Sequence, residues 1–261
     1  MLILLPPSEG KTAPVRGAAL DLASLSSPAL TPTRERVLDA LMAASARPDA
    51  VALLGVGAGI ADEVARNVDL RHAPAAEART VYTGVLYGAA GLDRLTPAQR
   101  RRAAESVRVV SGLWGLVAPE DRIPAYRLSM GVDLPGVGPL AAAWREPLRA
   151  ELGPRAEAGE LVVDCRSATY LAAWKPPRAA HGSWVQVRVL REVDGTRSVV
   201  SHHAKHTRGV LTRHLVTRRG AALTTPEHLA RAAGELVGTE LLAVELDAPA
   251  GRAATLSLVV A

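Results

Sequence analysis

SVRVVSGLWGLVAPEDRIPAYRLSMGVDLPGVGPLAAAW, residues 106–144, is the stretch around which the rest of this chain is organised. It begins with an apolar run, residues 107–110, that is typical of a buried strand. The segment after this strand gathers Ser111, Tyr126 and Arg127 before it reaches a glycine-rich turn. Polar side chains just past the carboxyl end of a buried strand are where sites cluster in α/β folds.

The glycine-rich turn, LPGVGPLAAA at residues 134–143, fits the hairpin of a helix-hairpin-helix element over about residues 122–150. Two glycines let a backbone turn tightly near an anion, and a proline in the next helix's first turn leaves amides free. We therefore predict that Gly136, Val137 and Gly138 contact nucleic-acid phosphates. Leu140 stands where a cation would help to hold a phosphate, and an ordinary turn between two helices is the alternative.

Composition bounds the class of protein. The chain has 261 residues, of which 48% are hydrophobic, enough for one domain over residues 1–261. The net charge of +5 favours anionic partners, with a uniformly solvated basic surface as the alternative. A single cysteine, Cys165, excludes an intramolecular disulfide and indicates the reducing cytoplasm. The apolar residues 1–5 are too few to span a membrane, so we expect a buried strand and a cytoplasmic monomer.

Lysine is rare in this basic chain, since only Lys11, Lys175 and Lys205 are lysines among 31 basic residues. A retained lysine marks a place that needs an ammonium able to lose its proton, which a guanidinium cannot do. Lys11 follows the first strand, and Lys205 heads a helix beside Arg208, where burial and neighbouring cations favour a neutral amine. Both lysines are predicted to act as a base or nucleophile.

Aromatic residues are equally sparse, with no phenylalanine and four tyrosines, Tyr82, Tyr87, Tyr126 and Tyr170. In such a chain these residues are predicted to be placed for their hydroxyl groups. Partly buried tyrosines with satisfied hydroxyls are the alternative.

Two glycine motifs do not predict a nucleotide site. Gly10-Lys11-Thr12 lacks the glycine that a P-loop has five residues earlier, where this chain has Leu5. The glycines at positions 55, 57 and 59 lack the spacing of a dinucleotide fingerprint. We therefore predict no cofactor.

A basic segment lies near the carboxyl end. Residues 195–226 contain no acidic side chain, and Arg213 and Arg218 there are predicted to contact the DNA backbone. His202 and His206 have the spacing of two metal ligands, but nearby carboxylates are missing and the neighbouring residues are basic. We predict no metal.

The elements add up to an α+β fold. Buried strands are predicted near residues 1–5, 107–110 and 161–164, with terminal strands at 241–246 and 255–260. Asp194-Gly195 predicts a hairpin between residues 184–191 and 198–201. Because this antiparallel pair sits among predicted helices, we expect a single-domain mixed sheet with surrounding helices.

Five segments resemble the YaaA family of peroxide stress proteins, in the same order and at similar spacing over nearly the whole chain. They are PPSEGKT (6–12), VYTGVLYGAAGLDRL (81–95), SGLWGLVAPEDRIPAYRLSMGVDL (111–134), VVDCRSATYLAAWKP (162–176) and HHAKHTRGVLTRHLV (202–216). The resemblance implies a YaaA-like "cantaloupe" fold with a helix-hairpin-helix motif and a positively charged cleft. It also implies DNA binding and a role in the oxidative stress response, through iron homeostasis and less oxidative DNA damage.

The resemblance also places the family's shared polar positions. They fall on Ser8, Lys11, Tyr82, Gly84, Ser111, Gly112, Asp121, Tyr126, Arg127, Ser167, Tyr170, Lys175, Lys205, Arg208 and Gly209. Trp114, where relatives often carry tyrosine, and Cys165, His202 and His203 depart from the family's pattern, so no role is carried over to the cysteine or the histidines.

Two functions remain open. The first is a protective protein that binds double-stranded or single-stranded DNA through backbone contacts. The second is an enzyme, in stress defence or a biosynthetic pathway, acting on a nucleobase, a nucleotide or another anionic small molecule. Its predicted catalytic residues are Ser8, Lys11, Tyr170 and Lys205, and its predicted ligand-binding residues are Tyr82, Ser111, Tyr126, Arg127, Ser167 and Arg208. A base-excision glycosylase using Asp164 is a special case, suggested by position alone.

Overall fold

Strand β1 (Leu2–Leu5) lies inside the main sheet, and all four of its side chains are buried. The computed structural model describes residues 1–199 and 202–261, without the side chains of residues 199, 202 and 203. Strand β1 pairs in parallel with β3 (Val107–Ser111) on one side and with β8 (Val162–Asp164) on the other. A parallel strand covered on both faces is apolar throughout, which explains the run LILL. The carboxyl ends of these three strands therefore meet at one edge.

The described residues form one eight-stranded sheet and two small hairpin-like sheets. The order in the large sheet is β11 (Ala243–Asp247), β12 (Ala254–Val260), β9 (Trp184–Val193), β8, β1, β3 and β4 (Gly115–Val117), with β10 (Thr196–Val199) paired to β9. The small sheets pair β2 (Ala76–Glu77) with β5 (Arg122–Ile123) and β6 (Asp133–Leu134) with β7 (Gly138–Pro139). The predicted mixed sheet is confirmed, and its central pairings are parallel.

Helices surround the sheet. They are α1 (Thr31–Ser45), α2 (Ala50–Leu53), α3 (Ala61–Ala65), α4 (Ala78–Val81), α5 (Val85–Ala90), α6 (Pro97–Ser106), α7 (Leu140–Ala143), α8 (Arg145–Glu157), α9 (Ala168–Leu171), α10 (His202–Thr217) and α11 (Pro226–Gly234). The 3-10 turns are η1 (Leu22–Ser24), η2 (Pro28–Leu30), η3 (Ala58–Ile60), η4 (Arg66–Asp69), η5 (Leu92–Arg94) and η6 (Arg178–Ser183). No helix in the described ranges is long and apolar enough to cross a membrane.

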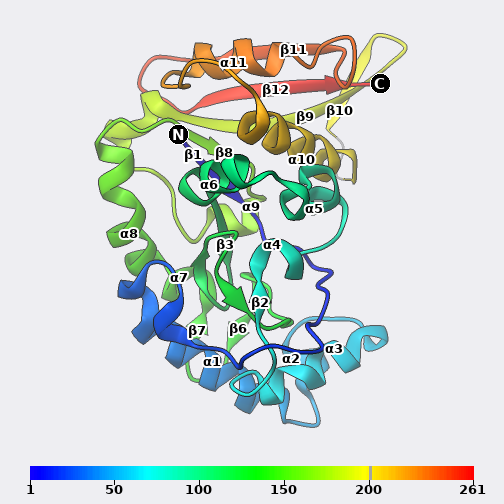
Figure 1. Ribbon diagram of the computed structural model, residues 1–261, viewed down its shortest axis with the longest axis vertical. Coiled ribbons are helices and arrows are strands. Elements are labelled where there is room, and N and C mark those ends of the chain that lie inside the picture. The colour runs from blue at the N-terminus through cyan, green and yellow to red at the C-terminus, as the bar shows by residue number, and fades with distance from the viewer. Residues whose placement is uncertain (200–201) are drawn as a thin grey trace.

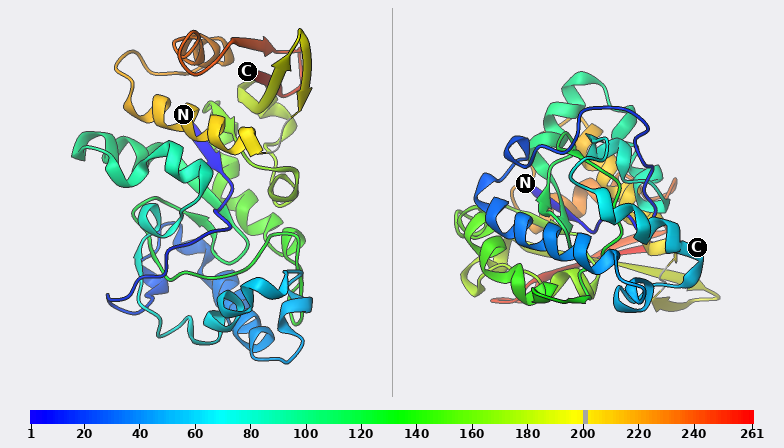
Figure 2. Two further views of the ribbon diagram at one scale, coloured as in Figure 1. Left: turned by 90° about the vertical axis from the view of Figure 1, so that its right-hand side faces the viewer. Right: turned by 90° about the horizontal axis from the view of Figure 1, so that it is seen from below.

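The molecule is elongated, and its two ends differ. Strands β9 and β12 with α11 form the upper end in Figure 1, whereas α1, α2 and α3 form the lower end. Both chain termini lie in the upper half. Figure 2 shows the same separation after a quarter turn, with the termini above and α1 below. Strands β1, β3 and β8 connect the two ends through the middle of the molecule.

Two helices begin at side-chain caps. Thr96 and Gln99 form a reciprocal capping box at α6, and the Thr225 hydroxyl accepts the His228 N–H at α11. A proline occupies the first turn after each cap, where its missing N–H costs no hydrogen bond.

The glycine hairpin is present, but the structure does not show a helix-hairpin-helix. Strands β6 and β7 form a tight turn in which Gly136 and Gly138 have φ values of +82° and +87°. Helices α7 and α8 follow it, whereas residues 124–132 before it are not helical. Leu140 is fully buried, because its side chain packs into the core instead of facing a ligand.

Helix α10 packs directly on α5 at Gly209. A Cβ at this position would clash with the carbonyl oxygen of Leu86 and would lie 2.8 Å from the Cβ of Ala89. Helix α10 also contacts β9, so this close approach ties the two helices to the sheet.

We predict that Gly209→Ala destabilises the protein by about 1–3 kcal/mol, because the two helices must separate. Gly88→Ala on α5 is the matched control, since its Cβ meets no atom within 4 Å. Alanine there should stabilise the helix by about 0.5–1 kcal/mol. Urea unfolding of both variants measures the difference, and equal stabilities would contradict the packing described here.

Candidate active site

The loop that leaves β1 is fixed against the segment between α4 and α5. Lys11 and Tyr82 form an isolated antiparallel bridge. The Tyr87 hydroxyl donates a hydrogen bond of 2.8 Å to the carbonyl oxygen of Pro6, directly after β1. The rings of Tyr82 and Tyr87 stack with centroids 5.2 Å apart. Main-chain and tyrosine contacts therefore hold the first loop in place.

Lys11 lies on the faces of two tyrosine rings. Its Nζ is 4.3 Å from the ring centroid of Tyr126 and 5.7 Å from that of Tyr82. Its Nζ donates a hydrogen bond of 2.6 Å to the carbonyl oxygen of Ser8. Burial, and after it the nearby Arg127, lower the pKa of Lys11 from 10.5 to about 7, against the opposing effect of the Glu63 and Glu9 carboxylates. A neutral amine is thus available near neutral pH.

A chain of hydroxyl groups lies beneath the rings. Ser111 Oγ accepts hydrogen bonds from the amides of Leu113 (3.2 Å) and Trp114 (3.1 Å), which occupy its lone pairs. Its own proton is therefore donated to the Tyr126 hydroxyl, 2.6 Å away. Tyr126 in turn donates to the Tyr82 hydroxyl at 3.0 Å. The chain ends on the Tyr82 proton, for which no further acceptor is found among the described residues.

Both phenols keep their protons at neutral pH. Burial raises the pKa of Tyr82 and of Tyr126 well above the usual value of 10. The hydroxyl chain therefore stays protonated, whereas Lys11 is the group that can accept a proton.

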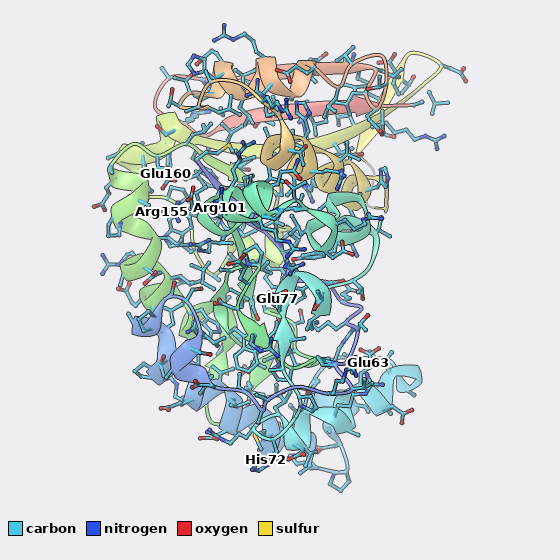
Figure 3. All side chains as sticks on the ribbon, in the orientation of Figure 1. Glu63, His72, Glu77, Arg101, Arg155 and Glu160 are labelled. Carbon is cyan, nitrogen blue, oxygen red and sulfur yellow. The ribbon has the colours of Figure 1, made fainter. Side chains whose placement is uncertain are left out.

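Arg127 lies beside this cluster. Its Nη1 is 3.2 Å from the carbonyl oxygen of Glu9 and 3.5 Å from Oε2 of Glu63 on α3. Figure 3 labels Glu63 on the right-hand side of the lower half. The buried Asn67 accepts the Arg127 N–H and donates to the Arg127 carbonyl, each at 2.8 Å, and also donates to Ser45 Oγ at 3.1 Å. This amide clamp fixes the backbone that carries the guanidinium.

Sequence reasoning missed Asn67. It is the only asparagine in the chain, so the argument from rarity that singled out the lysines applies to it equally. Glu9 and Glu63 were missed as well, because charged residues in loops and short helices carry no distinctive pattern.

Lys205 and Arg208 approach from α10 but occupy different surroundings. Lys205 is exposed, contrary to the burial expected for it, and its Nζ lies 3.8 Å from Oε1 of Glu9. Arg208 donates to the Val187 carbonyl on β9 at 2.9 Å, and its buried Nε has no partner within the described ranges. Lys205 thus extends the basic rim of the cluster, whereas Arg208 faces the sheet.

Ser8, Ser167 and Tyr170 lie at the same edge of the sheet. Gly84 has a φ of +102°, and a Cβ there would lie 3.0 Å from Ser8 Oγ, so glycine lets the serine fit. Ser167 is exposed at the start of α9, just after β8. Burial raises the pKa of Tyr170, while hydrogen bonds from the Met130 backbone and from the Ser129 side chain oppose the rise.

Asp164 and Cys165 are not available for chemistry. Both carboxylate oxygens of Asp164 accept hydrogen bonds from Arg166, and one also accepts from the Trp184 indole. Because neither carboxylate oxygen is free, the structure does not support the glycosylase role suggested for Asp164. Burial raises the pKa of the Cys165 thiol to about 12, so a thiolate is not formed at neutral pH.

The residues predicted to bind DNA do not form one surface. The hairpin β6–β7 lies in the lower half of the molecule and α10 in the upper half, as Figures 1 and 2 both show. Arg213 is exposed, while Arg218 forms an ion pair of 2.7 Å with Glu235. The pair His202 and His206 lies outside the described side chains, and no metal-binding group of three residues is found elsewhere in the described part.

Two surface cavities lie away from Lys11. The larger, about 480 Å³, is lined by Met1, Arg102, Arg155, Glu160 and Arg218, among others, at the amino end of β1. Figure 3 labels Arg155 and Glu160 together near α8, where they form an ion pair of 2.6 Å. The smaller, about 300 Å³, lies between the end of α10 and α11. Neither cavity is lined by a residue of the Lys11 cluster, which lies beyond the carboxyl end of β1.

A model of the family described as "Peroxide stress protein YaaA" matches residues 1–235. The chain belongs to this family. The peroxide stress match includes every residue of the Lys11 cluster and of α10, and it ends before β11 and β12. These last strands nevertheless belong to the sheet, because β12 pairs in parallel with β9 from Val185 to Arg191.

Relatives similar over nearly the whole chain carry the name UPF0246 protein. A protein of Streptomyces coelicolor is 49% identical over 96% of this chain and 94% of its own length. A protein of Corynebacterium efficiens is 43% identical over 100% of both chains. A protein of Corynebacterium glutamicum is 37% identical over 91% of this chain and 94% of its own.

We predict that Lys11 is the more reactive amine at pH 7 when it is compared with the exposed Lys175. Acylation with acetic anhydride, followed by peptide mass spectrometry, should show Lys11 labelling that rises through about pH 7. Burial and Arg127 set this midpoint, and Glu9 and Glu63 oppose them. Labelling of Lys11 that begins only near the usual lysine range would contradict the assigned environment.

The same shift predicts a pH dependence of stability. Folded Lys11 releases its proton near pH 7, whereas the unfolded chain holds it up to about pH 10.5. The unfolded state thus binds more protons between these values, so this group makes the free energy of unfolding rise with pH across that window. Lys11→Met should remove that contribution, which urea titrations at several pH values measure.

Proposed function

We propose that this peroxide stress protein binds an anionic small molecule at the Lys11 cluster, with Lys11 as base or nucleophile. The observation that carries the proposal is a partly buried amine lying on two tyrosine rings without a carboxylate partner in the described structure. A buried lysine that serves stability alone is normally paired with a carboxylate, because an unpaired buried charge is costly. Here the carboxylates of Glu9 and Glu63 go to Lys205 and Arg127 instead.

The surrounding groups suit an anion. The guanidinium of Arg127 and the ammonium of Lys205 supply positive charge at the rim of the site. The Tyr82 hydroxyl offers a proton, because the chain from Ser111 fixes its direction. An amine that accepts a proton beside a phenol that donates one is the arrangement that general acid–base catalysis requires.

We predict that Lys11→Arg keeps the fold but loses the biological activity. Arginine preserves the charge and cannot become a neutral amine, so an acid–base step should slow by at least about a hundredfold. Complementation of a deletion strain under peroxide stress measures the loss, and circular dichroism checks the fold. Lys175→Arg, at an exposed lysine, is the matched control.

Full activity of Lys11→Arg would show that the residue supplies only charge. Lys205→Arg adds a second comparison, because arginine can retain the contact with Glu9. If Lys205→Arg keeps its activity while Lys11→Arg loses it, the activity requires an amine at position 11 only.

A second candidate is binding of DNA through the backbone of the β6–β7 hairpin, which would limit iron-dependent oxidative damage to the bound DNA. The observation that favours it is the openness of the turn. A Cβ at Gly136 or Gly138 meets no atom within 4 Å, so a phosphate can approach the backbone closely. Such contacts position a protein on nucleic acid without reading its sequence.

We predict that Gly138→Val weakens duplex binding on the order of tenfold, equally for different sequences, because bulk blocks the phosphate. Gly159→Val is the matched control, since Gly159 is also open and has a φ of +77°. Fluorescence anisotropy measures both variants over a range of salt, and affinity should fall steeply as salt rises. Equal affinities of the two variants would count against the hairpin.

A further inference from the structure

We infer that Lys11 condenses with the carbonyl carbon of a small oxo acid to form a Schiff base, with Arg127 holding the acid's carboxylate. This inference rests on the proposed anion site and names its ligand class. It also assigns Lys11 the role of nucleophile, where the proposal above leaves base and nucleophile open.

The hydrogen bonding of Lys11 leaves its nitrogen able to attack. A neutral amine has two protons and one lone pair, and the Ser8 carbonyl takes one proton at 2.6 Å. The Tyr126 ring, with its centroid 4.3 Å from Nζ, covers one side of the amine. The residue as a whole is partly exposed. The lone pair is not consumed by a donor among the described residues.

The charge beside the amine selects the ligand. Arg127 has a side chain that is 20% exposed, and its contact with Glu63 is a loose 3.5 Å. A planar guanidinium binds a carboxylate through two parallel hydrogen bonds, which a loosely held arginine can rearrange to form. Arg127 is also close enough to Lys11 to lower the pKa of that amine. Arg127 Nη1 lies 3.2 Å from the carbonyl oxygen of Glu9, the residue after the Ser8 carbonyl that Lys11 contacts. An acid whose carbonyl carbon is next to its carboxylate suits an amine and a cation that contact neighbouring residues.

The reaction balances without an oxidant or a reductant. The Lys11 nitrogen forms a bond to the carbonyl carbon, the π electrons move to the oxygen, and one proton passes from the nitrogen to that oxygen to give a carbinolamine. The carbinolamine then loses its oxygen as water after a further protonation, while the nitrogen forms the double bond to carbon. In sum, a neutral amine, a carbonyl compound and one proton give a protonated imine and water. Solvent supplies this proton.

Reduction of the intermediate tests the inference. The full-length protein is incubated with pyruvate at pH 7 and treated with sodium borohydride, and its peptides are analysed by mass spectrometry. We expect an N-carboxyethyl group on Lys11, exceeding that on the exposed Lys175 by at least about tenfold, because an ordinary lysine is nearly all protonated at this pH. Arg127→Gln should lower trapping of pyruvate much more than trapping of acetone, a neutral ketone of similar size.

The outcomes separate this inference from the proposed function. Calorimetric titration with pyruvate measures binding in the absence of borohydride. Binding that depends on Arg127, without any adduct on Lys11, would overturn the Schiff base and keep the anion site. Absence of both binding and adduct in the folded protein would overturn both. Equal labelling of Lys11 and Lys175 would show unselective chemistry and would also overturn the inference.

Discussion

The parallel pairing of β1 with β3 and β8 is the constraint on which the site depends. Strand β1 is buried along its whole length, so its apolar side chains fix its register between two neighbours. Because all three strands run in one direction, the loops that follow Leu5, Ser111 and Asp164 leave the sheet at the same edge. A one-residue slip of β1 would move Lys11 away from the tyrosine rings and separate it from the hydroxyl chain.

The polar groups at this edge are fixed by hydrogen bonds to the main chain more than by one another. Asn67 holds the backbone of Arg127, Tyr87 holds Pro6, and the amides after Ser111 orient its hydroxyl. The polar atoms of these supporting residues are therefore already hydrogen-bonded to the main chain. Among the described residues the Lys11 lone pair and the Tyr82 proton have no hydrogen-bond partner, and these are groups of the kind that acid–base chemistry uses.

Much of the fold could be predicted from sequence, because burial and capping leave local patterns. The run LILL and the Asp194-Gly195 turn each predicted an element that the structure contains. The helix-hairpin-helix was not shown, because the glycine pattern describes the turn and says nothing of the segment before it. That segment has Pro124 and is held extended by the long-range clamp on Arg127, which no local pattern reveals.

The cluster itself was reached by residue rarity, and the same reasoning explains its limits. A chain that otherwise prefers arginine keeps a lysine at position 11, where a guanidinium would be buried against Tyr126 with its charge permanently in place. Lysine can release its proton and so avoid the free-energy cost of burying a charge. The position therefore suits a basic side chain that can become neutral. Rarity cannot distinguish this case from Lys205, which is exposed and paired with Glu9. The difference between the two lysines is one of environment, and environment is fixed by the tertiary contacts that bring Tyr82 and Tyr126 beneath the amine of Lys11.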